Sequence, residues 1–156
     1  MAVSQRPRHY RKKCVVLPYA LFLSILASTP PEHSLPATLD VTIEGLRKRA
    51  GVIRACLIAR AQAFPDCVGD PSSIRLTIPA SGRLSFNAVP PGNYALTLFH
   101  DENANGKLDT ILGIPREGFG FSRNPTVRFA APKYDKVVIK IASGLNRITV
   151  RLQYLL

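Results

Sequence analysis

The chain has 156 residues, 46% of them hydrophobic, so it can bury the core of one domain and gives no reason to expect a second. Its formal charge is +11, but five basic residues precede the first apolar run, and without them 16 basic residues stand against 10 acidic ones, a charge of +6. No later stretch interleaves basic and aromatic residues. The composition therefore argues against a nucleic-acid-binding protein.

The N-terminal stretch has the composition of a secretory signal peptide. Residues 1–13 are basic, and residues 14–27, CVVLPYALFLSILA, are apolar and uncharged. This run is shorter than the roughly 20 apolar residues that span a bilayer, and Pro18 interrupts it. We predict a signal peptide at 1–28, an exposed proline-rich spacer at 29–38 and a folded domain at 39–156. The mature protein would then be periplasmic or secreted, touching a membrane only before cleavage.

Short stretches of period-two alternation fill the remaining chain. The first contains Leu39, Val41 and Ile43; VIRACLIA follows after a basic turn, and we expect these two stretches to pair as a hairpin. Further strands are predicted in residues 74–78, 84–86, 94–98, 136–141 and 146–154, with a brief one in 126–129. Because no helical run occurs, the pattern predicts an all-β, antiparallel Greek-key β-sandwich of about seven strands.

Cys56 and Cys67 are the two cysteines of the predicted mature chain. Thiols pair and persist in an oxidising compartment, and a bridge would tie the end of a strand to the following loop. Two buried free thiols are the alternative. A zinc site is a poorer interpretation, because His33 and His100 have no ligand-like spacing to either cysteine. We favour the disulfide, because the predicted compartment is oxidising and the number of cysteines in the mature chain is even.

The stretch DENANGKLD, residues 101–109, spaces its polar residues as a calcium loop does. The candidate oxygen ligands are Asp101, Asn103, Asn105, the Lys107 carbonyl and Asp109, with Glu117 completing the shell. The bidentate Glu of a helix-loop-helix site is replaced by Leu112, and carboxylates are few. We therefore expect weak affinity, on the order of 10⁻⁴ M or weaker.

A tight turn at Asn105-Gly106, with Asp and Asn side chains capping backbone amides, is the alternative to calcium. We favour calcium, because a turn alone does not need oxygens at all four side-chain positions. Residues 110–125 show no periodicity, and a loop this long usually needs something to order it. Phe119 and Phe121 within it form either an exposed ligand surface or a cover for the core, whereas Phe129 is expected to cover the core.

Residues 100–125, HDENANGKLDTILGIPREGFGFSRNP, closely resemble the signature of secreted bacterial proteins catalogued as domain of unknown function 2141. The likeness extends from about Leu39 to the C-terminus and includes PPGNYAL. It implies an exported sandwich of the transthyretin-like or adhesin B-repeat type and brings no established activity; together with the strand pattern, we expect a transthyretin-like or immunoglobulin-like fold. Residues 101–109 also resemble the calcium loops of B-repeats in bacterial surface adhesins.

These features predict an exported, monomeric, non-catalytic module that binds calcium weakly and has a glycan or an envelope protein as its partner. The alternative is a carbohydrate-active or other hydrolase that uses a carboxylate pair of the same loop, drawn from Asp101, Glu102, Asp109 and Glu117, with His100 as a helper. Ser122 lacks the context of a nucleophile elbow. We therefore predict that the protein is not an enzyme.

Overall fold

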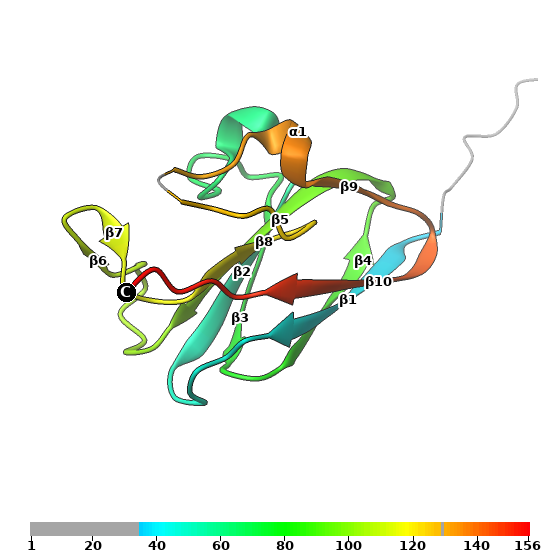
Figure 1. The fold of residues 1–156 in the computed structure, drawn as a ribbon. Helices are drawn as coiled ribbons and strands as arrows, with labels where there is room; N and C mark the ends of the chain where they lie inside the picture. Colours follow the sequence, from blue (N-terminus) through cyan, green and yellow to red (C-terminus); the bar gives the residue numbers. More distant parts are fainter. Residues whose placement is uncertain (1–34, 129) are drawn as a thin grey trace, which may run out of the picture. The chain divides into compact units, whose positions relative to one another are not determined.

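The computed structural model describes residues 35–128 and 130–156, and there the chain is built mainly from β-strands (Figure 1). The predicted signal peptide, most of the predicted spacer, His33 and Phe129 lie outside the described residues. No helix in the described part is both long and apolar enough to cross a bilayer.

One sheet has three strands in the order β10-β1-β4: β10 (Gly144–Arg151), β1 (Ala37–Glu44) and β4 (Arg83–Val89). Leu39, Val41 and Ile43 of β1 are buried, as their alternation with polar residues predicts. β1 is antiparallel to β4 but parallel to β10. The prediction of a purely antiparallel architecture is therefore wrong at this pair.

The second sheet has the order β3-β2-β5-β8, and β9 also pairs with β5. Its strands are β3 (Ile74–Pro79), β2 (Val52–Ile58), β5 (Gly92–Asp101), β8 (Phe119–Phe121) and β9 (Val138–Ile141). All its pairs are antiparallel. β8 and β9 pair with different halves of β5, since Thr97–Phe99 face β8 and Gly92–Ala95 face β9.

The two sheets share one hydrophobic core. The first sheet contributes Leu39, Val41, Leu84, Phe86 and Val150, and the second contributes Ile53, Leu57, Leu96, Leu98 and Ile141. Tyr94, Leu96 and Leu98 alternate into this core from β5, as their period-two spacing predicts. The other face of the second sheet is also partly covered and carries the candidate site.

The predicted hairpin between the first two strands is wrong, because β1 and β2 belong to different sheets. Both sides of each strand are occupied: β1 lies between β10 and β4, and β2 lies between β3 and β5. The connection crosses from one sheet to the other. Gly51 has a positive φ of 80°, and a Cβ atom there would collide with the backbone of Asp101 and Glu102, so the close approach requires glycine.

Residues 110–141 also differ from prediction. The stretch 110–125, expected to lack strands, contains the hairpin β6 (Thr110–Ile111) and β7 (Ile114–Pro115) as well as β8. Residues 126–128 form no strand. The predicted strand at 136–141 begins only at Val138, after the helical turn α1 (Tyr134–Val137). A second short helix, η1 (Ala61–Ala63), follows β2.

Candidate functional site

Asp101, the first residue of the predicted calcium loop, ends β5 and is fully buried. Its Oδ2 accepts hydrogen bonds from Nε of Arg54 on β2 (2.7 Å) and from the Gly106 amide (2.8 Å), and its Oδ1 accepts one from the Asn105 amide (3.0 Å). Burial alone would raise the pKa of Asp101, but these three hydrogen bonds outweigh it and hold the pKa below its ordinary value. Asp101 is therefore an ionised anchor for the loop.

Glu117 closes the other end of the loop and is also buried. One carboxylate oxygen accepts a hydrogen bond from the Glu102 amide (2.8 Å), and the other accepts one from the Asp109 amide (3.0 Å). The β6–β7 hairpin lies between Asp109 and Glu117, turns at Gly113, which has a positive φ of 79°, and brings the chain back. A single side chain thus joins the start, the middle and the end of residues 101–117.

The exposed tip of the loop is held by its two asparagines. Nδ2 of Asn103 and Nδ2 of Asn105 donate to the two carboxylate oxygens of Asp109 at 2.8 and 2.9 Å. Their Oδ1 atoms accept hydrogen bonds from the amides of Asn105 (3.1 Å) and Lys107 (2.8 Å). The nitrogens rather than the oxygens of both carboxamides therefore face Asp109. This is the geometry of the turn-capping alternative.

The residues that sequence spacing selected do share one network, because Asp101, Asn103, Asn105, Asp109 and Glu117 are linked through the hydrogen bonds above. Within residues 35–128 and 130–156, no three side chains of His, Cys, Asp or Glu gather as a metal-binding group. The carboxylates and carboxamides of the loop nevertheless supply hard oxygens, the kind of donor that calcium prefers. Each oxygen that accepts one N–H retains a second lone pair for another partner.

The side chains of Glu102 and His100 make a second set of contacts at the base of the loop. Glu102 accepts from Nε of Arg47 (2.7 Å) and pairs with Nζ of Lys48 (2.6 Å); burial would raise its pKa, but these contacts lower it below the ordinary value. His100 is fully buried, with Nε2 at 2.7 Å from the Ala50 carbonyl and Nδ1 at 3.2 Å from the Tyr154 hydroxyl. Both residues tie neighbouring segments together.

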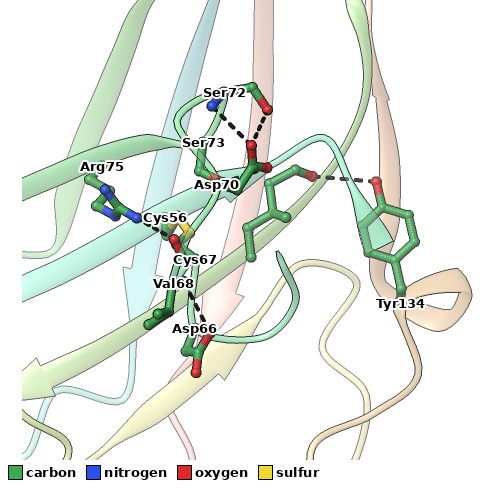
Figure 2. The surroundings of a disulfide bond; sticks show 10 residues. Cys56, Asp66, Cys67, Val68, Asp70, Ser72, Ser73, Arg75 and Tyr134 are labelled. Atoms are coloured by element: carbon green, nitrogen blue, oxygen red, sulfur yellow. Dashed lines mark hydrogen bonds between the residues drawn. A yellow bond between two sulfur atoms is a disulfide. The ribbon is translucent and has the colours of Figure 1, made fainter. Parts of the chain in front are cut away.

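Cys56 and Cys67 form the predicted disulfide, with their Cα atoms 6.5 Å apart (Figure 2). The bridge joins β2 to the irregular segment that follows it. Nη2 of Arg75 on β3 donates to the Cys67 carbonyl. The next turn is centred on Asp70, whose carboxylate accepts from the Ser72 amide (3.0 Å), the Ser72 hydroxyl (2.6 Å) and the Ser73 hydroxyl (3.1 Å). These bonds lower the pKa of Asp70.

Phe119 and Phe121 lie on the outer face of the second sheet and do not form an exposed platform. They are only 6% and 7% exposed and belong to a second apolar cluster with Ala95, Val127 and Val137. The ring centroids of Phe119 and Phe121 are 6.1 Å apart. The ring of Phe64, which follows η1, has its centroid 5.7 Å from that of Phe121 and packs against the same cluster. Both phenylalanines line a cavity of about 580 Å³.

Four parts of the chain wall this cavity above the sheet: residues 65–68 beside the disulfide, residues 106–108 with Gly113 and Pro115, Val127 with Ala130 and Ala131, and Leu155. Sequence patterns did not reveal the cavity, because its walls come from four separate parts of the chain. They also did not reveal Arg54 as the partner of Asp101. The only signal was a charged residue inside the apolar run VIRACLIA.

Fold and site together define an all-β domain whose long loop is fastened by its own carboxylates. The chain belongs to a bacterial family: the family model described as "Uncharacterized protein conserved in bacteria (DUF2141)" matches residues 41–149. This match confirms the resemblance drawn from residues 100–125. Searches of curated proteins and of solved structures returned no match.

Proposed function

We propose that the protein is an exported, non-catalytic β-sandwich module of the cell envelope that acts in binding or as a structural element. The observation that carries this proposal is the use of the acidic side chains in residues 101–117. Asp101, Glu117 and Asp109 each accept two or more hydrogen bonds within the protein. Carboxylates whose oxygens are used in this way stabilise the loop, which supports a structural role over a catalytic one.

Two features support export and one supports the sandwich. The basic and apolar pattern of residues 1–28 suits a signal peptide, and the Cys56–Cys67 disulfide suits an oxidising compartment. The core shared by two sheets suits a Greek-key sandwich of transthyretin-like or immunoglobulin-like type, with β1 and β10 as a parallel pair. A monomer that presents residues 101–117 to a glycan or an envelope protein is the simplest form of such a module.

Calcium remains part of the proposal, with Asp101, Asn103, Asn105, the Lys107 carbonyl, Asp109 and Glu117 as ligands. Bound calcium would supply positive charge between these oxygens and so strengthen the loop. Asn103 and Asn105 would first have to turn their carboxamides so that oxygen rather than nitrogen faces Asp109. The cost of exchanging those hydrogen bonds agrees with weak affinity.

Thermal unfolding with and without calcium tests this part. If the Kd is about 10⁻⁴ M, 1 mM CaCl₂ stabilises the fold by about 1.4 kcal/mol. Asp109→Ala should abolish the rise in Tm, whereas Asp135→Ala, a change at an exposed carboxylate on α1, should keep it. An unchanged Tm at 5 mM CaCl₂ would show that the loop relies on its own hydrogen bonds.

The non-catalytic part is tested separately with a panel of polysaccharides and ester substrates. The protein should show no turnover with or without calcium. Hydrolysis that persists in EDTA and disappears in Glu117→Gln would overturn the proposal in favour of the hydrolase.

A further inference from the structure

The outer face of the second sheet changes from polar to aromatic across its strands. One row of paired residues runs from β3 to β8 through Thr77, Arg54, Phe99 and Phe119. The adjacent row runs through Arg75, Cys56, Thr97 and Phe121. All eight residues line the cavity. Neighbouring strands are about 4.8 Å apart, so roughly 14 Å separates the polar edge at β3 from the aromatic edge at β8.

The charges around the cavity favour an anion. Arg54, Arg75 and Lys107 are the cationic residues of its lining, and Asp66 is its carboxylate. Asp66 already accepts a hydrogen bond from the Val68 amide (3.1 Å). Arg54 is oriented by buried Asp101 through Nε, and its Nη1 and Nη2 atoms donate to no other residue in the described part of the chain. A held guanidinium with unused donors is a preformed anchor for a carboxylate.

The aromatic half of the cavity suits an apolar chain. Leu108, Val127 and Leu155 wall it above Phe99, Phe119 and Phe121. A volume of about 580 Å³ lies within the range of about 300–1,000 Å³ that is usual for small-molecule sites. Most such sites combine an apolar lining with a few polar groups that fix orientation.

The β6–β7 hairpin extends the apolar surface beyond the cavity, since Gly113 and Pro115 belong to the cavity wall. Its tip exposes Ile111 by 48%, Leu112 by 97% and Ile114 by 43%. Leu112 and Gly113 both have positive φ (50° and 79°), a turn that favours Asn-Gly rather than Leu-Gly. Local turn chemistry therefore does not explain Leu112, whereas a ligand chain that emerges from the cavity would.

We propose that the cavity binds a single-chain amphiphile with a carboxylate head, of the fatty-acid type, with the head over Arg54 and Arg75 and the chain over Phe99, Phe119 and Phe121. This site goes beyond the proposed function, because the proposed roles of the loop and of calcium require no bound amphiphile, although Arg54 and Lys107 belong to both.

The test uses 1-anilinonaphthalene-8-sulfonate, a fluorescent probe with an apolar body and one anionic group, bound to the folded mature protein. Dodecanoate should displace it at least 10-fold more effectively than dodecyltrimethylammonium, which has the opposite charge on the same chain. Leu108→Glu, which puts a carboxylate in the apolar wall, should weaken dodecanoate binding at least 10-fold. Leu145→Glu, at an exposed leucine of β10 on the other sheet, is the matched control and should have no effect.

A second variant tests the head group without disturbing the core. Arg75→Gln with Lys107→Gln changes two exposed cations and should weaken dodecanoate several-fold while leaving dodecanol unchanged. Tm and near-ultraviolet circular dichroism confirm folding of each variant. The inference fails if dodecanoate and dodecyltrimethylammonium compete equally, if Leu145→Glu matches Leu108→Glu, or if the double variant binds as the wild type does. Calcium stabilisation measured in parallel reports on the proposed function alone.

Discussion

Two irregular segments flank the second sheet, and different forces hold them. Residues 101–117 are fastened by side-chain hydrogen bonds, chiefly those of Asp101 with Arg54 and of Glu117 with two backbone amides. Residues 56–67 are fastened by a covalent bond between Cys56 and Cys67. A charge network responds to pH and to loss of one partner, whereas a disulfide responds to reductant. We therefore predict that the two anchors of this sheet can be released independently.

The largest effect is expected when Arg54 is changed to Met. Asp101 is fully buried, so the variant leaves a carboxylate in the protein without its cationic partner. Breaking such a pair costs about 3–5 kcal/mol, and because the Arg54 side chain is 34% exposed we expect the lower end of that range. Urea unfolding at pH 7 measures the loss.

Arg147→Met is the matched control for this change, since Arg147 is an exposed arginine on β10 of the other sheet. Its unfolding free energy should stay within about 0.5 kcal/mol of the wild-type value. The double variant Arg54→Met with Asp101→Leu should recover part of the loss, because no buried charge is left alone. Equal losses in Arg54→Met and Arg147→Met would contradict a structural role for the Arg54–Asp101 pair.

A slightly smaller effect is expected when Cys56 and Cys67 are both changed to Ala. The bridge joins two residues that are 11 positions apart in the sequence. Without it the unfolded chain gains conformational entropy, so the free energy of unfolding should fall by about 2–3 kcal/mol. Reductant should lower the Tm of the wild type to that of the variant and leave the variant unchanged. If reductant leaves the Tm of the wild type unchanged even when it is added under unfolding conditions, the bridge does not form in solution.

The strands were predictable where the pattern is local. Leu39, Val41 and Ile43 alternate into the core because side chains of a strand alternate by geometry, whatever the strand pairs with. Partners were not predictable in the same way. β1 pairs with β10, whose residues lie about a hundred positions later, and neither alternation nor turn chemistry encodes that choice. Hence the hairpin with β2 was a reasonable prediction that the sheet order overturned.

The loop residues were predictable because they are close in sequence and have the spacing of oxygen ligands in a calcium loop. The spacing of Asp101, Asn103, Asn105 and Asp109 brought them correctly into one network, but it could not tell which atom of each carboxamide faces Asp109. Arg54 was missed because it lies 47 residues before its partner. The Phe119 and Phe121 prediction left two alternatives, since only the strand pairing with β5 shows that their rings lie on the sheet.

The smallest expected effect is a loss of stability at low pH in residues 101–117 but not in the segment that the disulfide holds. The folded-state pKa of Asp101 is lowered, so its ionised form adds stability that is fully present above the unfolded value of about 3.9 and is lost as the pH falls through the lower folded value. Below about pH 4 the Asn105 and Gly106 amides, which donate to Asp101, should lose hydrogen-exchange protection.

The Cys67 amide is the internal reference for that measurement, because it donates to the Ala63 carbonyl (2.9 Å), a group that does not titrate. Its protection, corrected for the intrinsic exchange rate, should be similar at pH 6 and pH 3, while that of Asn105 and Gly106 falls. Asp101→Asn should remove most of the difference between the two pH values, since it has no charge to lose. If Cys67 loses protection in step with Gly106, acid opens the whole domain and the two anchors are not independent.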